Sequence, residues 1–421
     1  MKTSISFPVV NYKFSLFVLQ LCLYFIGIGF SAGGGNFPTQ QSNGFGVYKS
    51  LFIMLPVLWF GYLFLKKPKT ALSKLGLVFK ANSLIVFYFI IAAIILLFAV
   101  DAFYSLGRLF YTLMGFAGLI ALLTQYFFFG YESKIIYLKK IINYFSFYIL
   151  LFPLYVACTK GLENFRFKLE GLYLIHPNIL AAFYAHVCLW HGISFLLYKK
   201  KSIANIIYSI LFLLVEYLLF SRAVIGGLLI CFSVLPFLVF FYSKNAKALI
   251  LGLFILLSYM VLYVLVIIDI IQMTDLASLV TRNDSLASLV TLTNRTILWQ
   301  ELIGRLEGAR IVTGYGYSVI DRNFGIDLGT GILYGAHNTY LSILLGSGIF
   351  ALLAILFYLT GNVIKIIKQK NMIEPAVFYS LLCSYLLFLI TGCSSEEIGV
   401  SFSVTFAYLV MMTTIVLRSN K

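Results

Sequence analysis

One long segment in the second half of the chain is rich in arginine and lacks lysine. No lysine occurs between Lys247 and Lys365, although the chain has 31 lysine and arginine residues in total. A guanidinium is planar and permanently charged, and its forked donors suit two-point contact with a phosphate or a carboxylate. The segregation therefore predicts an anionic ligand. The basic and imidazole residues in this gap are Arg282, Arg295, Arg305, Arg310, Arg322 and His337.

Arg295 stands at the start of a segment whose pattern predicts a helix over 294–308. Trp299, Leu302 and Leu306 would share one face of that helix. The first turn of a helix already carries positive potential, so an arginine is favoured there when an anion lies between it and the free amides. We therefore expect an anion site at Arg295; the alternative is an exposed arginine with a small dipole penalty.

His337 precedes Asn338, which is a natural N-cap for an apolar helix. The positive end of that helix disfavours imidazolium, and a neutral ring is the form able to accept a proton. His337 is accordingly a candidate general base. A structural histidine at the membrane interface is the competing interpretation.

Other charged and imidazole residues lie near the ends of predicted spans. Arg222 and Arg108 each lie at a membrane edge, where an arginine often only extends its charge into water. Glu216 lies about two turns inside the membrane, which is costly without a partner, and either arginine is a candidate partner. His176 precedes Pro177 at the start of another span.

Two further patterns predict less chemistry. Gly314 and Gly316, in a Gly-x-Gly arrangement, predict a turn. Asp321 and Asp327 match no recognised ligand spacing, and the six cysteines lie in or beside apolar runs, so no metal site is expected.

The composition is that of an integral membrane protein. Of the 421 residues, 61% are hydrophobic and 11% are charged, and apolar runs recur near the length of about 20 residues that spans a bilayer. The net charge of +16 does not indicate nucleic acid, because the lysines form short clusters between the runs. An all-α fold of about twelve spans follows, over residues 14–30, 47–65, 83–100, 107–128, 141–158, 175–198, 206–222, 223–242, 249–271, 338–364, 373–392 and 400–417.

The lysines also predict an orientation. Nearly all fall in alternate connections between these spans, which the positive-inside rule assigns to the cytoplasm, together with both termini. Residues 1–271 then hold the first nine spans, 272–337 form one long extracytoplasmic loop, and 338–421 hold the last three. A candidate active site in that loop would face away from the cytoplasm.

Several of these elements, in this order, resemble the O-antigen ligase and O-antigen polymerase superfamily of bacterial membrane glycosyltransferases. The resemblance is carried by a span that ends in Ser221-Arg222, a long loop with Asn294-Arg295 and Trp299, the Gly-x-Gly of 314–316, and a span that opens with His337-Asn338-x-Tyr340-Leu341 and contains Gly346 and Gly348.

The resemblance implies a glycosyltransferase fold of the C class in the bacterial plasma membrane. Its donor would be a glycan on undecaprenyl diphosphate, used without a cofactor or a metal. Arg222 and Arg295 would hold the diphosphate, and His337 would deprotonate the acceptor hydroxyl. Substrate-binding positions would be Arg108, Glu216, Asn338, Tyr340, Trp299 and His176.

We interpret the chain as a polymerase that joins lipid-linked repeat units into O-antigen, capsule or exopolysaccharide. The alternatives are a ligase that moves the glycan onto lipid A core and a flippase for lipid-linked oligosaccharides. The flippase is less favoured because the charges concentrate in one loop, whereas transporters usually place polar residues at the midplane of related halves. The expected partners are the lipid-linked donor and acceptor, the bilayer and a chain-length regulator protein, with no nucleic acid.

Overall fold

A computed structural model describes residues 12–31, 45–131, 135–162, 165, 177–197, 202–219, 221–243, 246–267, 295–319, 326–327, 333–393 and 402–419. These residues are almost entirely helical. The exception is an antiparallel pair of two-residue strands, β1 (Ile326–Asp327) and β2 (Leu333–Tyr334). The helices are α1 (Tyr12–Ser31), α2 (Phe45–Lys66), α3 (Pro68–Ala81), α4 (Ser83–Ile95), the 3-10 turn η1 (Leu96–Phe98), α5 (Ala102–Phe128), α6 (Ile135–Lys160), α8 (Pro177–Leu197), α9 (Ile203–Leu219), α10 (Arg222–Ser243), α11 (Ala246–Ile267), α14 (Arg295–Gly304), α15 (Arg310–Thr313), α16 (Thr339–Lys368), α17 (Pro375–Gly392) and α18 (Val404–Ser419).

The helices agree with a polytopic membrane protein. Each range predicted as a span overlaps an α-helix, although the ends differ: the range 83–100 passes from α4 into η1, and 206–222 extends past the end of α9. Among the described residues, six helices are long and apolar enough to cross a bilayer by themselves, or seven if α3 and α4 count as one bent span. The other apolar helices do not pass the same test over their described residues, so the count of twelve spans stays a prediction.

Helix α3 was not predicted, because its lysines led residues 66–82 to be interpreted as a connection. In the structure α3 is a helix that meets the following helix at a bend of 77°. Ala71 and Val78 are buried on one side, whereas Lys69 and Lys80 are exposed on the other. The mean hydropathy of the whole segment does not reveal such a two-sided helix, because the apolar positions are too few to outweigh the lysines.

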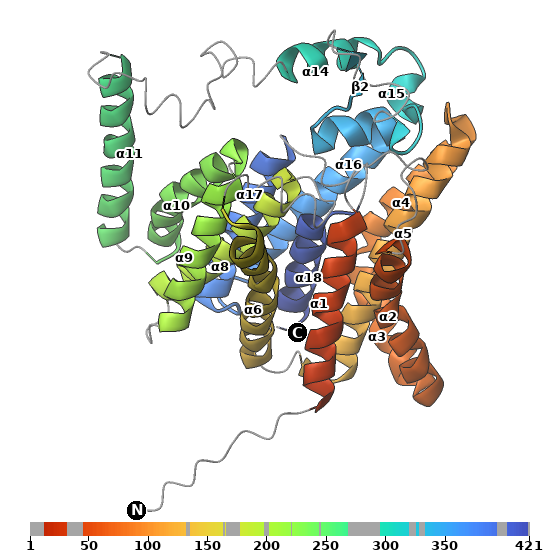
Figure 1. Ribbon diagram of the computed structural model, residues 1–421, viewed down its shortest axis with the longest axis horizontal. Helices are drawn as coiled ribbons and strands as arrows, with labels where there is room; N and C mark the ends of the chain where they lie inside the picture. The colour runs from red at the N-terminus through yellow and green to blue at the C-terminus, as the bar shows by residue number, and fades with distance from the viewer. Residues whose placement is uncertain are drawn as a thin grey trace, which may run out of the picture.

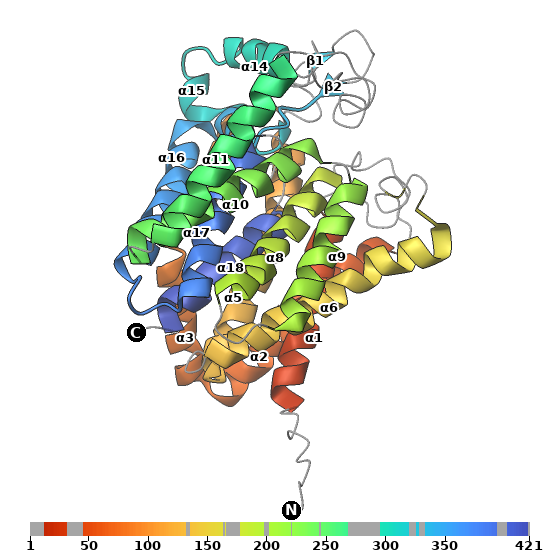
Figure 2. The same cartoon turned by 90° about the vertical axis from the view of Figure 1, so that its left-hand side faces the viewer.

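The core is built around α8 and α18, which lie side by side in the middle of the bundle (Figure 2). Aromatic rings fill the space between these helices and α6. The rings of Phe145 and Phe183 lie 5.7 Å apart at 73°, and the rings of Phe183 and Tyr408 lie 6.0 Å apart at 80°. Such edge-to-face contacts add to the packing that holds apolar helices together.

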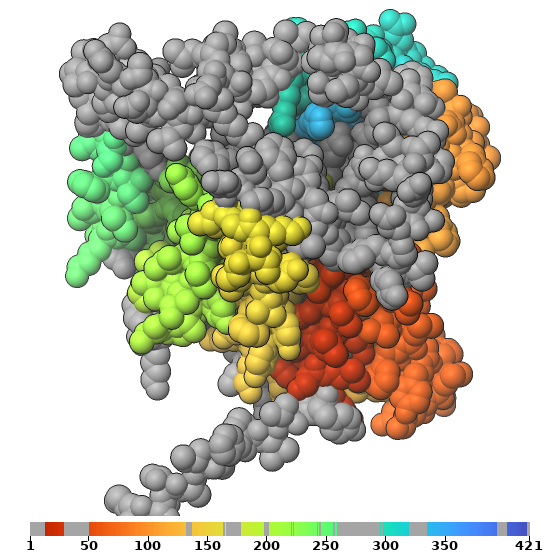
Figure 3. All heavy atoms as spheres, viewed as in Figure 1, coloured from red at the N-terminus to blue at the C-terminus, as the bar shows by residue number. Residues whose placement is uncertain are grey.

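The short helices α14 and α15 lie together at one end of the bundle (Figure 1). Helix α16 runs from beneath them into the bundle and packs against α4 and α17. Helices α1 and α2 lie side by side on the part of the molecule away from α14 (Figure 3). The candidate residues predicted near the starts of α14 and α16 therefore lie at this end of the bundle.

Candidate active site

Helix α14 is attached to the start of α16 by a hydrogen bond and an apolar cluster. The indole Nε1 of Trp299 donates to the carbonyl oxygen of Ala336 at 2.8 Å. Leu298 and Leu302 pack in a buried cluster with Ala336, Leu341 and Leu345. The predicted helix is confirmed, although α14 ends at Gly304 and not at 308. Residues 305–309 form turns, and Gly308 has a φ of +54° within them.

This attachment brings Arg295 and His337 to the same end of the molecule. Arg295 is the first residue of α14, one helical turn before Trp299, so the two side chains lie on the same face of the helix. His337 follows Ala336, the residue to which Trp299 is bonded. Both side chains are half-buried.

The backbone at His337 turns sharply into α16. His337 has a φ of +45°, in the left-handed region that residues other than glycine rarely adopt. Asn338 then caps the helix, because its Oδ1 accepts from the amides of Tyr340 and Leu341 at 3.0 and 3.1 Å. The predicted N-cap is confirmed. Strained backbone of this kind often occurs where a functional side chain must point in a fixed direction.

The hydroxyl of Tyr340 donates to the carbonyl oxygen of Leu389 at 3.4 Å, and its ring lies against Gly392. The start of α16 is thus joined to the end of α17. That end also contacts the start of α10, where a Cβ on Gly227 would lie 2.7 Å from Leu387 Cδ1. Helix α10 begins at Arg222, so the backbone of Arg222 belongs to the same end of the bundle as His337.

Helix α16 is interrupted at Gly348, which has a φ of +76° and a ψ of 179°. The interruption releases the carbonyl groups of Leu345 and Gly346 from the helical hydrogen-bond pattern. They accept instead from the amides of Tyr315 and Gly316, at 2.7 and 3.0 Å. Unsatisfied carbonyls are costly near a membrane, so this pairing is what permits the broken helix.

The contact is between backbones and leaves no room for side chains. A Cβ on Gly348 would lie 1.8 Å from the carbonyl oxygen of Val312, and one on Gly314 would lie 2.7 Å from that of Leu345. The Gly-x-Gly at 314–316 was expected to be only a turn. It is instead one half of a clamp, which we define as residues 312–316 against 345–348, and this clamp fixes the first turns of α16.

Arg310 secures the clamp to the helices below it. Its Nη1 donates to the carbonyl oxygens of Phe98 and Gly314 at 2.9 and 3.0 Å, and its guanidinium lies 5.1 Å from the ring centre of Tyr315. The Tyr315 hydroxyl in turn donates to the carbonyl oxygen of Arg305. Arg310 therefore has a structural function. Arg305 lies 4.0 Å from Glu301 in a surface ion pair.

Arg108 lies on α5, close to the segment that forms the clamp. Its Nε donates to the hydroxyl of Tyr104 at 3.1 Å. Tyr317, at the end of the clamp segment, is fully buried and donates to Thr112 Oγ1 at 3.0 Å. Burial raises the pKa of Tyr317 to about 12, so its hydroxyl stays protonated, while the charge of Arg108 acts in the opposite direction.

Glu216 is 1% exposed near the end of α9. Among the described residues, neither of its carboxylate oxygens has a hydrogen-bond partner. Arg108 was one candidate partner and forms no ion pair with Glu216 in the described part of the chain. The side chain of Arg222, the other candidate, lies outside the described residues, as does His176. Over the same residues no group of three His, Cys, Asp or Glu side chains is arranged to hold a metal.

The fold thus brings together the helices that carry Arg295, Trp299, His337, Asn338 and Tyr340. Asn338 caps α16 as predicted, whereas the sequence did not predict that Trp299 would join α14 to the start of α16 or that Tyr340 would join α16 to α17. Gly346 and Gly348 were noticed only as members of a motif. Gly346 and Gly348 are separated by one residue, as are Gly314 and Gly316. This shared spacing was the one signal in the sequence that the two backbone segments contact each other.

Residues 207–356 match the family described as O-antigen ligase. The matched range contains Glu216, Arg222, α14, the clamp and His337. No curated protein matches the chain. The family match and the arrangement of these motifs in the fold agree, and over residues 207–356 the match supports the O-antigen ligase and O-antigen polymerase superfamily.

Proposed function

We propose that the protein is a polymerase that joins oligosaccharide repeat units carried on undecaprenyl diphosphate. The reaction takes place at the outer face of the bacterial plasma membrane, with both termini in the cytoplasm, and it needs no metal. The fold is then a glycosyltransferase fold of the C class.

The observation that carries the proposal is the attachment of α14 to α16 through Trp299 and Ala336. It places an arginine at a helix N-terminus and a histidine at the entrance of another helix, at one end of a membrane bundle. An anion-binding group and a proton acceptor at a membrane surface suit the transfer of a glycan from a lipid diphosphate.

In the proposed reaction an acceptor hydroxyl attacks the anomeric carbon of the donor glycan. The new C–O bond forms as the bond between that carbon and the diphosphate oxygen breaks. His337 takes the hydroxyl proton, and the lipid diphosphate leaves with the bonding electron pair. General base catalysis of this kind contributes about 10²- to 10⁴-fold.

Arg295 and Arg222 stabilise the charge that grows on the departing diphosphate. Preorganised cations are most effective where charge develops in the transition state, and two arginines can offset the charge of a diphosphate. The first-turn amides of α14 add donors beside Arg295. Arg108 and Glu216 are proposed to contribute to the binding of the lipid-linked substrate.

The test is incubation of the purified protein with an undecaprenyl-diphosphate repeat unit, with and without lipid A core. A ladder of longer lipid-linked glycans in the absence of core is the expected result. The polymerase proposal is wrong if no product longer than one repeat unit forms under any of these conditions.

The second candidate is a ligase, which the description of the matched family favours. A ligase would give a core-linked product and no ladder without core. The site residues would keep the same functions, because both reactions transfer a glycan from a lipid diphosphate to a hydroxyl.

A further inference from the structure

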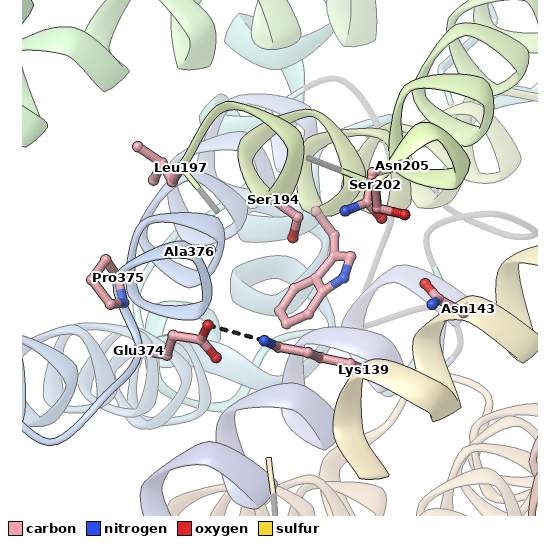
Figure 4. Close-up of a pocket in the computed structure, with 10 residues that line it drawn as sticks. Lys139, Asn143, Ser194, Leu197, Ser202, Asn205, Glu374, Pro375 and Ala376 are labelled. Carbon is pink, nitrogen blue, oxygen red and sulfur yellow. Dashed lines mark hydrogen bonds and ion pairs between the residues drawn. The ribbon is translucent and has the colours of Figure 1, made fainter. Parts of the chain in front are cut away.

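A cavity of about 560 Å³ lies between α6, α8, α9 and α17 (Figure 4). Its size is within the range of about 300–1,000 Å³ that small ligands occupy. The cavity has no part in the proposed reaction. It is lined by Lys139, Asn143, Trp190, Ser194, Leu197, Ser202, Asn205, Glu374, Pro375 and Ala376.

The cavity lies at the end of the bundle away from α14. Helix α16 starts at the α14 end and runs to Lys368, and α17 begins only a short turn later at Pro375, which lines the cavity. Leu197 and Ser202, at the end of α8 and just before α9, line it as well. By the distribution of lysine this is the cytoplasmic end.

One cation and one anion form an ion pair in the wall of the cavity. Lys139 Nζ on α6 lies 2.9 Å from Glu374 Oε1 at the start of α17. Their side chains are 33% and 27% exposed, so the pair remains accessible to a ligand. Figure 4 shows this pair along one side of the cavity, and Ser194 also lines the cavity.

Hydrogen-bond donors line the opposite wall. The Oδ1 of Asn205 lies 3.0 Å from His191 Nδ1, and His191 Nε2 lies 2.7 Å from Ser146 Oγ. A carboxamide oxygen only accepts, so His191 Nδ1 donates to it and Nε2 accepts from Ser146. The amide nitrogen of Asn205 is then the group left to donate into the cavity, and Figure 4 shows it on the cavity side.

Ser194 supplies a second donor. Its side chain is 1% exposed, lines the cavity, and its Oγ has no hydrogen-bond partner among the described residues. A buried hydroxyl without a partner is costly, and a polar ligand atom bonded to it would remove that cost. A ligand acceptor, such as a phosphate oxygen, would satisfy both Ser194 and Asn205.

The charges select the class of ligand. A simple anion would be repelled by the carboxylate of Glu374, and a simple cation would be repelled by the ammonium of Lys139. A zwitterion with a phosphate and a primary ammonium satisfies both, because its phosphate accepts from Lys139, Ser194 and Asn205 while its ammonium donates to Glu374.

The surroundings favour a lipid as the source of this zwitterion. The helices that frame the cavity present exposed apolar side chains toward the hydrocarbon. Phe147 on α6 is 52% exposed, and Ile206 and Ile207 on α9 are 37% and 50% exposed. Acyl chains can lie along these helices while the head group enters the cavity.

We propose that the cavity between α6, α8, α9 and α17 binds the phosphoethanolamine head group of a membrane phospholipid, through Lys139, Glu374, Ser194 and Asn205. This site is independent of the glycosyl-transfer site at the other end of the bundle.

The test is native mass spectrometry of the purified full chain with equal amounts of phosphatidylethanolamine, phosphatidylglycerol and phosphatidylcholine. One phosphatidylethanolamine is expected to be retained with about tenfold preference, which corresponds to about 1.4 kcal/mol and is close to the contribution of one charge-assisted hydrogen bond. Phosphatidylcholine tests the ammonium contact because its quaternary nitrogen has no N–H. Equal retention of the three lipids would overturn the proposal.

Variants assign the preference to the cavity. Glu374→Gln removes the negative charge that pairs with the ammonium and should abolish discrimination between phosphatidylethanolamine and phosphatidylglycerol, whereas Lys140→Gln, which changes an exposed neighbour outside the cavity, should leave it unchanged. Unaltered discrimination in Glu374→Gln would contradict the proposal. Displacement of the lipid by soluble glycerophosphoethanolamine at equal concentration would contradict the assignment to a lipid.

Discussion

The two ends of the bundle are held together by different kinds of contact. At the α14 end the elements meet through their backbones, in the glycine clamp of 312–316 against 345–348. At the other end α6 and α17 meet through the long side chains of Lys139 and Glu374. Backbone contacts fix positions closely and tolerate little change, whereas a solvent-accessible ion pair leaves room for a ligand. The first arrangement suits catalysis and the second suits binding.

The largest effect is expected for Gly348→Ala in the clamp. A Cβ there would lie 1.8 Å from the carbonyl oxygen of Val312, and the φ of +76° costs a further 1–3 kcal/mol or so for a residue with a side chain. We expect loss of glycan transfer and a lower thermal unfolding temperature. The measurements are product formation from the lipid-linked repeat unit and a thermal melt in detergent.

Gly361→Ala is the matched control for this variant. Gly361 lies on the same helix, and nothing lies within 4 Å of a Cβ placed on it. This change should be neutral or slightly stabilising, because alanine favours a helix over glycine by roughly 0.5–1 kcal/mol. Equal product formation and equal unfolding temperatures in the two variants would show that the clamp does not position α16.

His337→Ala should lower the rate by about 10²- to 10⁴-fold, the usual contribution of a general base. The fold should persist, since Asn338 still caps α16. The rate is measured as extension of undecaprenyl-linked repeats by purified protein in vesicles. Extension at the wild-type rate would exclude His337 as the base, and movement of the lipid across the vesicle membrane without extension would favour a flippase.

The comparison also shows which features a sequence can predict. Helices at both ends were predicted well, because long apolar runs have few alternatives in a membrane. For example, the border between α9 and α10 was expected after residue 222, and α10 begins at Arg222. Helix α3 was missed because its buried face holds only a few apolar residues between lysines.

Contacts between distant residues were not predictable in the same way. The partner of Gly314 and Tyr315 lies about thirty positions further along the chain, and no local pattern connects the two segments. The same holds for Lys139 and Glu374, which are 235 positions apart. The candidate residues of the α14 end could nonetheless be proposed from the sequence, since Arg295 and His337 each lie at a helix start, where charge and imidazole have a clear physical consequence.

Trp299→Phe should have a moderate effect, because it keeps an aromatic ring but removes the donor to the Ala336 carbonyl oxygen. A neutral hydrogen bond contributes about 0.5–1.5 kcal/mol, which corresponds to a two- to twelvefold reduction in rate or so. Trp59→Phe on α2 is the control and should retain the wild-type rate. A wild-type rate in Trp299→Phe as well would show that apolar packing alone holds α14 on α16.

The smallest effect on stability is expected at the other end, for Lys139→Gln. Ion pairs as exposed as this one contribute about 0–1 kcal/mol, so the unfolding temperature should change by only a few degrees. A double-mutant cycle with Glu374→Gln, followed by thermal melts, measures the coupling between the two side chains. A coupling well above about 1 kcal/mol would mean that the pair holds α6 and α17 together, as the glycine clamp holds α16. A small coupling, together with loss of the preference for phosphatidylethanolamine, would confirm that the two ends differ in kind, because the pair would then contribute more to ligand binding than to the fold.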